Sequence, residues 1–368
     1  MSDILATNDA EAKALQHLLH KQMPTHRKAY SDRTAWLMAC CSELAYIKYN
    51  PLLPKTEQKD YFLKQVETLM GEQKKSALIK LIDLLGYDHK AEKAKLINEL
   101  QLLNMNLLET YDKNGSQAIL LSYDDYLVLA FRGTEPTSVK DIRSDAEGNK
   151  TPWVKDDESK GFIHSGFKKA YEQIGSQIQD RLNEEDCRDK PLFITGHSLG
   201  GSLATIATKA LNHQGKIAAC YTFGCPRVGD ATWIGDIKDP LYRVVNAADA
   251  VTMLPPGDLT VSILGWLAKL IPQFGKSWSK TITSSFGGYM HCGDMRYLEN
   301  IAPGQFKEAK LLYSVSLYYR LKGLFFFNRF AWGKPLSDHS ISVYRKKLEQ
   351  IAENRNPDNA DIPDNQVQ

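Results

Sequence analysis

A serine between two glycines is the clearest sign of chemistry in this sequence. Gly196, Ser198 and Gly200 form a G-x-S-x-G pattern between an apolar run at 192–195 and an Ala/Leu-rich segment that begins at residue 199. The apolar run predicts a buried strand and the following segment a helix, so the serine stands at a sharp turn. A hydroxyl held out of such a turn beside a helix N-terminus can act as a nucleophile, because that helix end stabilises negative charge. The alternative is a glycine-rich turn that merely contains a serine, and the flanking elements favour the catalytic interpretation.

Alternating strands and helices predict the sheet that positions this turn. Residues 108–111 and 117–123, joined by Asn114-Gly115, predict a β-hairpin, and residues 126–131 predict a buried strand. The elements predicted beyond this hairpin are helices 165–182, 199–212 and 232–236 and strands 191–195, 217–223 and 242–245. Such alternation is typical of βαβ crossovers. We therefore expect an α/β fold with a mostly parallel central sheet and helices on both faces.

Composition limits the classes of protein and partner. The 368 residues suffice for one large α/β domain or two ordinary ones, and 43% of them are hydrophobic, so a full core can form. A formal net charge of +2 gives no case for a nucleic-acid partner. The six cysteines show neither disulfide-framework nor metal-ligand spacing and are interpreted as free thiols in a reducing compartment.

Membrane and export signals are not apparent in the sequence. No apolar run approaches the roughly 20 residues that span a bilayer, so no transmembrane segment is expected. The first residues, Met-Ser-Asp-Ile-Leu-Ala-Thr-Asn-Asp, lack the basic and apolar regions of a secretory signal. A cytoplasmic location is the default expectation, with export that uses no cleaved signal left open.

The first third of the chain is predicted to be helical. Asp32 can cap a helix whose apolar residues recur at three-to-four spacing up to Ile47. Further amphipathic helices are predicted at 58–69, 75–85 and 91–103. Their lysines and glutamates are balanced, which is typical of a solvated face. No chemistry is expected in this region.

Six motifs follow one another in a definite order along the chain. They are Arg132-Gly133-Thr134-Glu135-Pro136, Phe162-Ile163-His164-Ser165-Gly166-Phe167, the turn at 196–201, Phe223-Gly224-Cys225-Pro226-Arg227-Val228-Gly229-Asp230, the segment 245–256 and Leu336-Ser337-Asp338-His339-Ser340. Together they resemble the class 3 lipases, the family of the small fungal triacylglycerol lipases. The resemblance runs from about residue 117 to about residue 344. It implies an α/β-hydrolase fold in which the turn at Ser198 is the nucleophile elbow.

This resemblance implies roles at the positions where the motifs match. Ser198 would be the nucleophile, Asp249 the acid of a catalytic triad and His339 its base, in the chain order that this fold requires. Backbone N–H groups of Thr134 and Leu199 would form the oxyanion hole, with the Thr134 hydroxyl as a further donor. Neither a metal nor an organic cofactor is expected.

Other histidines and aspartates compete for these roles. His291 is the second candidate for the base and is interpreted as structural. His197 is interpreted as a packing residue of the turn, because neighbours in a tight turn point apart. Asp230 and Asp258 are alternatives to Asp249, but the first is better placed to cap a helix near residue 232 and the second lies in a Pro-Pro-Gly-Asp turn.

Four further polar residues are expected to be structural. His164 should tether backbone at the start of its helix, and His213 should be a solvated residue at a helix end. Asp338 is interpreted as a surface carboxylate, with orientation of the His339 loop as the alternative. Arg132 should anchor a buried carboxylate or backbone carbonyl, since an unpaired buried charge is costly.

The domain limits follow from these patterns. Residues 1–105 are expected to form a helical extension or cap, and residues 106–352 the α/β-hydrolase domain. Within that domain, residues 257–288 form an apolar insert, and residues 353–368 are expected to be a disordered tail.

Two segments bear on the substrate. Residues 135–148, where the lid of related proteins usually lies, are too polar to bind fat alone. Residues 259–274 carry an apolar helical stripe, and residues 311–330 mix aromatic and basic side chains, which suits a lipid–water interface. The alternative is that both cover the sheet or line an acyl pocket. We expect residues 259–274 to be a mobile cap over Ser198.

We therefore expect a serine hydrolase that cleaves carboxylic esters of lipids through an acyl-serine intermediate. A triacylglycerol or acylglycerol lipase is the leading interpretation, with a lipid ester as substrate and transient contact with a lipid interface or membrane surface. A phospholipase A1, conceivably an exported effector, is the first alternative, because class 3 sequences include both activities. A non-catalytic scaffold that binds lipid or protein is the second.

Overall fold

The computed structural model describes most of the chain. The described residues are 4–20, 23–25, 29–49, 67–68, 70, 88–133, 150–155, 158–255, 288–301, 304–316, 318–320 and 337–356. Several predictions concern segments outside them: helix 75–85 and most of helix 58–69, Thr134 and segment 135–148, Asp258, insert residues 257–287, residues 321–330 and residues 357–368.

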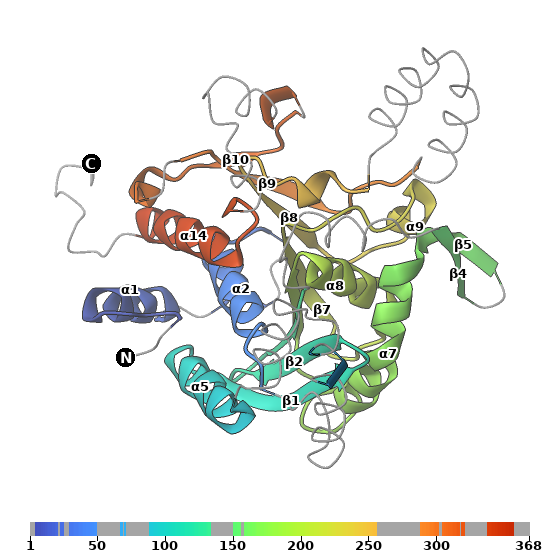
Figure 1. Ribbon diagram of the computed structural model, residues 1–368, viewed down its shortest axis with the longest axis horizontal. Helices are drawn as coiled ribbons and strands as arrows, with labels where there is room; N and C mark the ends of the chain where they lie inside the picture. The colour runs from blue at the N-terminus through green and yellow to red at the C-terminus, as the bar shows by residue number, and fades with distance from the viewer. Residues whose placement is uncertain are drawn as a thin grey trace.

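A central sheet organises the fold (Figure 1). Within the described residues it has eight strands in the order β1-β2-β3-β6-β7-β8-β9-β10. The strands are β1 (Asn106–Lys113), β2 (Ser116–Ser122), β3 (Leu127–Phe131), β6 (Leu192–His197), β7 (Ile217–Phe223), β8 (Leu241–Asn246), β9 (Asp294–Leu298) and β10 (Leu311–Tyr313). Strands β3, β6, β7, β8 and β9 pair in parallel, whereas β1, β2 and β3 form an antiparallel meander. The predicted mostly parallel sheet is confirmed.

Local turn chemistry explains the start of the sheet. Asn114 and Gly115, between β1 and β2, have φ values of 51° and 82°. Two consecutive positive φ values are what a two-residue hairpin turn requires, and Asn-Gly is the pair that tolerates them best. The predicted hairpin is thus confirmed. Strands β9 and β10 were not predicted, nor was a separate two-stranded sheet of β4 (Lys150–Lys155) and β5 (Glu158–His164).

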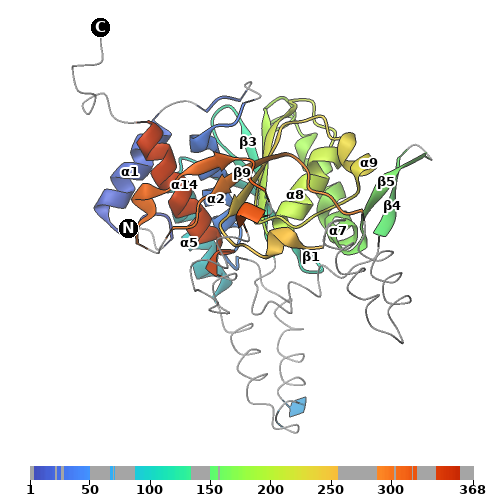
Figure 2. The ribbon, with the colours of Figure 1, turned by 90° about the horizontal axis from the view of Figure 1, so that it is seen from above.

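Helices cover both faces of the sheet (Figure 2). The described helices are α1 (Asp9–Leu19), α2 (Asp32–Leu44), α5 (His89–Leu102), α7 (Ser165–Leu182), α8 (Leu199–Ala210), α9 (Ala231–Gly235) and α14 (Ile341–Arg355), with short 3₁₀ turns η1 (Val251–Met253) and η2 (Phe306–Glu308). Residues of α2 and α14 share one hydrophobic cluster with Val128 of β3, while α7 and α8 share another with Leu129. Successive strand residues face opposite sides, so the sheet separates two cores.

The helix α2 is part of this layered core, although the sequence placed it in an extension outside the hydrolase domain. Ser31 caps it by accepting a hydrogen bond from the Thr34 N–H at 3.3 Å. The helix is buried on nearly all sides, as is typical of a helix enclosed by protein. Ser42 Oγ lies 2.9 Å from Thr195 Oγ1 on β6. One face of the sheet is therefore completed by residues from the N-terminal third of the chain.

The helix α14 closes the same face. Arg345 Nε donates to Glu43 Oε2 of the α2 helix, and Ser342 Oγ donates to Glu43 Oε1 at 2.5 Å. The helix extends to Arg355, three residues into the segment for which a disordered tail was predicted. It is among the described helices, none of which is long and apolar enough to cross a membrane. All six cysteines are buried free thiols, as predicted.

Replacement of Leu37 by alanine tests whether α2 unfolds together with the sheet. Leu37 is fully buried, so the cavity should lower the free energy of unfolding by about 2–5 kcal/mol and shift the main transition. Ile97 on α5 is 39% exposed, and Ile97→Ala should cost less than about 1 kcal/mol. Urea unfolding followed by circular dichroism measures both. A separate early transition in Leu37→Ala, with the main transition unmoved, would contradict a shared core.

Candidate active site

Ser198 sits in a strained turn between β6 and α8. Its backbone has φ 58° and ψ −128°, a combination that residues other than glycine rarely adopt. The turn is so tight that a Cβ on Gly196 would lie 2.2 Å from the Gly200 carbonyl oxygen. A Cβ on Gly200 would lie 2.3 Å from the Phe131 carbonyl oxygen. The glycines on either side of Ser198 are therefore required, as the sequence predicts.

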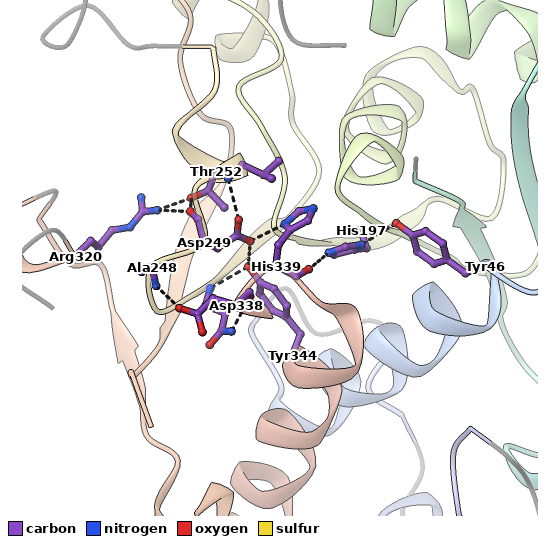
Figure 3. A network of polar contacts seen from close by, with 11 residues as sticks. Tyr46, His197, Ala248, Asp249, Thr252, Arg320, Asp338, His339 and Tyr344 are labelled. Atoms are coloured by element: carbon purple, nitrogen blue, oxygen red, sulfur yellow. Dashed lines mark hydrogen bonds and ion pairs between the residues drawn. The ribbon is translucent and has the colours of Figure 1, made fainter. Parts of the chain in front are cut away.

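Asp249 and His339 form a buried pair close to this turn (Figure 3). His339 Nδ1 lies 2.9 Å from Asp249 Oδ2, and the two side chains are 1% and 0% exposed. Asp249 follows β8, and His339 lies two residues before the start of α14, so the pair joins two loops 90 residues apart in sequence. The catalytic roles of both residues remain predictions. The structure shows that the residues chosen as acid and base do meet.

The carboxylate of Asp249 is fully hydrogen-bonded. Its Oδ1 accepts from the Val251 N–H at 2.9 Å, and its Oδ2 accepts from the Tyr344 hydroxyl at 2.6 Å as well as facing His339. Burial and the adjacent carboxylate raise the pKa of Tyr344, so this hydroxyl keeps its proton and donates. Its oxygen also accepts from the Asn246 N–H at 3.0 Å. A buried carboxylate with this set of donors does not leave a lone charge in the core.

His339 presents its second nitrogen without a partner. With Nδ1–H donating to Asp249, Nε2 carries the lone pair that a general base needs. Nε2 is buried and makes no hydrogen bond within the described part of the chain, including to Ser198. Ser198 itself is 3% exposed. Catalytic hydrogen bonds often close only when substrate is bound.

His197 tethers the His339 loop in addition to packing in the turn. Its Nε2 lies 2.6 Å from the His339 carbonyl oxygen, and its Nδ1 lies 2.8 Å from the Tyr46 hydroxyl (Figure 3). Burial, together with the nearby His339, lowers the pKa of His197 well below its usual range. The ring is therefore neutral, with Nε2–H donating to the carbonyl and Nδ1 accepting from Tyr46. The prediction of a packing role for His197 was incomplete.

Tyr46 was missed by sequence reasoning. It follows α2, a helix to which no chemistry was assigned, and its partner His197 is 151 positions away. A Cβ on Gly133 would lie only 2.3 Å from the Tyr46 hydroxyl oxygen, so Tyr46 also packs against Gly133. The one available signal was a tyrosine, which normally needs a partner for its hydroxyl, at the end of an apolar helix.

Asp338 is buried, which overturns its interpretation as a surface carboxylate. It is 8% exposed, and its Oδ2 accepts a hydrogen bond from the Ala248 N–H at 3.2 Å. Its backbone carbonyl accepts from Asn246 Nδ2 at 2.8 Å. The residue before His339 is thus tied twice to the segment that leads to Asp249. The alternative considered from the sequence, that Asp338 orients the His339 loop, fits these contacts better than a surface position does.

The structure also settles the smaller structural predictions. His164 Nδ1 accepts from the Phe167 N–H at 3.3 Å and caps α7, as predicted. Asp230 Oδ1 likewise caps α9 by accepting from the Trp233 N–H at 2.9 Å.

Arg132 Nη1 donates to the side-chain oxygen of Gln117 at 2.6 Å, and its expected bond to a buried carboxylate or backbone carbonyl stays a prediction. One of these predictions is wrong. His213 is buried rather than solvated, and its Nε2 lies 2.7 Å from the Lys190 carbonyl oxygen.

Backbone N–H groups beside Ser198 are available to an oxyanion. Leu199 is the first residue of α8, and the first N–H groups of a helix have no carbonyl partner within it. Thr134 lies outside the described residues, so its role stays a prediction. The residue before it, Gly133, passes close to the nucleophile, because a Cβ there would lie 3.2 Å from Ser198 Cβ. The chain thus reaches the serine where the second donor is expected.

Part of the chain is similar to known lipases. Residues 128–259 match the family described as Lipase (class 3). The secreted mono- and diacylglycerol lipase 1 of Fusarium solani is 36% identical over 100 residues, which are 26% of this chain and 30% of that protein. A lipase of Caenorhabditis elegans is 30% identical over 154 residues, which are 39% of this chain and 41% of that protein. The chain therefore spans only 30–41% of the length of these relatives.

A solved lipase structure from Rhizopus microsporus var. chinensis has 18% sequence identity and a TM-score of 0.46, covering 94% of this chain and 92% of that one. The family segment, residues 128–259, contains Ser198 and Asp249. Over residues 128–259 the chain is therefore similar to the class 3 lipases.

Proposed function

We propose that this protein is a serine hydrolase that cleaves carboxylic esters of lipids through an acyl-serine intermediate, with acylglycerols as substrates. One observation carries the proposal: the buried His339–Asp249 pair leaves a basic nitrogen free near a serine held in a strained turn. The match of residues 128–259 to the class 3 lipases supports ester hydrolysis. The mono- and diacylglycerol lipase of Fusarium solani supports the choice of acylglycerols.

The proposed reaction begins with attack of Ser198 Oγ on the ester carbonyl carbon. His339 Nε2 takes the serine proton, and Asp249 stabilises the imidazolium through Nδ1–H. The carbonyl oxygen becomes an oxyanion, which accepts hydrogen bonds from the Leu199 N–H and, by family resemblance, from Thr134. Collapse breaks the bond to the alcohol oxygen, which receives the proton from His339.

Deacylation repeats these steps with water. His339 removes a proton from the water molecule, whose oxygen attacks the acyl carbon bound to Ser198 Oγ. Collapse of the second tetrahedral intermediate releases the fatty acid and returns the proton to Ser198.

Exposed tyrosines support contact with a lipid surface. Tyr313, Tyr318 and Tyr319, all from the aromatic and basic run at 311–330, are 65%, 73% and 43% exposed. The apolar rings and polar hydroxyls of such residues suit the boundary between lipid and water. Arg296 lies over the Tyr313 ring at 4.8 Å from its centroid and adds positive charge.

Labelling with a fluorophosphonate probe separates an enzyme from a scaffold. We expect the folded protein to be labelled at neutral pH and Ser198→Ala to be unlabelled, because only an activated serine reacts. Ser202→Ala, one turn further along α8, is the control and should be labelled like the parent chain. Absence of labelling in the parent chain would favour a non-catalytic scaffold.

Parallel assays on triacylglycerol, phosphatidylcholine and p-nitrophenyl esters of graded length then identify the substrate. Faster cleavage of phosphatidylcholine than of acylglycerol would favour the phospholipase A1 alternative.

Gly224→Ala should disturb the Asp249–His339 pair in the fraction of the protein that folds. Gly224 has φ +58°, and a Cβ there would lie 2.7 Å from Asp249 Oδ2 and 2.9 Å from the His339 ring. The methyl group should push the pair apart and lower kcat/KM about 100-fold, since displacements of about 1 Å have effects of that size. Gly235→Ala, where no atom lies within 4 Å, is the control. Unchanged kinetics in Gly224→Ala would contradict the role of the pair.

Tyr46→Phe tests the tether through His197. Loss of the hydroxyl leaves His197 Nδ1 without its donor and should cost about 1–3 kcal/mol of stability. Because His197 holds the His339 carbonyl, we also expect kcat to fall several-fold with KM unchanged. Tyr49→Phe is the matched control, since its buried hydroxyl donates to the Ala118 carbonyl at 3.2 Å. Equal kinetics in the two variants would contradict a positioning role for Tyr46.

A further inference from the structure

Arg243 is a buried cation with free donors. It lies in the middle of β8 and is 9% exposed. Its Nε and Nη1 atoms are buried and have no hydrogen-bond partner among the residues that the structure describes. Buried guanidinium groups are normally paired, because an unpaired buried charge is costly.

The sheet does not supply a counter-charge for Arg243. The parallel register places Thr222 of β7 on one side and Met295 of β9 on the other. Residues directly opposite one another in neighbouring strands point to the same face, about 4.8 Å apart. Both neighbours are uncharged, so the strands flanking Arg243 leave its charge uncompensated.

Two further arginines, Arg320 and Arg227, lie near enough to lower the pKa of Arg243, so they add like charge. Arg320 is 5% exposed, and its Nη2 donates to the Asp249 carbonyl oxygen at 3.3 Å and to Thr252 Oγ1 (Figure 3). Its Nε is buried without a partner within the described ranges. Arg227 Nη1 donates to the carbonyl oxygens of Met253 and Pro255, each at 2.5 Å. The carbonyl and hydroxyl oxygens that accept these hydrogen bonds are neutral.

Among the described residues, three further groups near Arg243 are neutral: Cys225, Cys292 and His291. Burial raises the pKa of the Cys225 thiol to about 11 and of the Cys292 thiol to about 12, so both keep their protons. Burial and the three arginines lower the pKa of His291 well below its usual range, so this ring is uncharged. The same causes, burial first and the neighbouring arginines next, lower the pKa of Arg243 to about 10. The carboxylate of Asp249 acts on the pKa of Arg320 but is already hydrogen-bonded to His339 and Tyr344.

We propose that Arg243 and Arg320, with His291 beside them, form a binding site for an oxyanion, a carboxylate or phosphate group. The free groups on both arginines are N–H donors, which excludes a cation and suits a ligand made of acceptor oxygens. An oxyanion has several oxygens and can accept from both guanidinium groups at once. Arg320 also holds the Asp249 carbonyl, so the site adjoins the proposed acid of the triad.

Two sources share this chemistry: inorganic phosphate and the carboxylate of a released fatty acid. The second source rests on the proposed function, and the first does not. Thermal unfolding in low millimolar phosphate or octanoate, against sodium chloride at equal ionic strength, distinguishes them. We expect one or both to raise the Tm of the parent chain by about 2–5 °C at concentrations well above Kd.

Substitutions at Arg243 and at Met295, its neighbour on β9, test whether Arg243 binds the anion. Met295→Glu places a carboxylate opposite Arg243, so we expect a higher Tm in anion-free buffer and loss of the anion response. Met295→Gln has nearly the same shape without the charge and should keep the response. Arg243→Gln should lose it, whereas Lys113→Gln, which removes one exposed positive charge, should keep it.

Three results would overturn the site. They are the absence of any rise in Tm above the sodium chloride control, an equal rise in the parent chain and Met295→Glu, and an equal rise in Arg243→Gln. If Arg243→Gln fails to fold, the two Met295 variants still decide the matter. In Ser198→Ala the anion response should be unchanged, so failure of the proposed hydrolase activity and failure of this site are distinguishable.

Discussion

A carboxylate at Asp249, removed from water, imposes the strongest constraint on this structure. Each oxygen of a buried carboxylate needs donors, and here they come from His339, Tyr344 and the Val251 backbone. Two of these donors lie at or after residue 339, so the C-terminal helix α14 has to pack where it does. Asp338 and Asn246 add further links between the same two loops. The hydrogen bonds that stabilise the buried Asp249 carboxylate thus also fix the position of His339.

The second support of the centre comes from the opposite end of the chain. The helix α2 fills one face of the sheet and delivers Tyr46 to His197, which in turn holds the His339 carbonyl. Ser198 lies between these two supports in a backbone conformation that costs energy. Such strain persists only where surrounding packing enforces it, and here α8, β3 and the flanking glycines do so.

Local signals allowed much of the fold to be predicted. The Asn114-Gly115 turn, the helix at Ser165–Leu182 and the strand at Ile217–Phe223 depend on neighbouring residues, and each was predicted within a few positions. The serine turn and the Asp249–His339 pair followed from motifs, and the structure brings the pair together.

The missed features depend on distant residues. The helix α2 is apolar on nearly every side, so its pattern does not show which face meets the sheet. In α14, charged residues such as Arg345 and Lys347 are buried by pairing with partners far along the chain, so the helix resembles a solvated one in sequence.

The placement of both helices also has a consequence for synthesis on the ribosome. Tyr46 and Ser198 precede His339 and Tyr344 in the sequence, so on a nascent chain the serine turn leaves the ribosome before the residues that complete the Asp249 network.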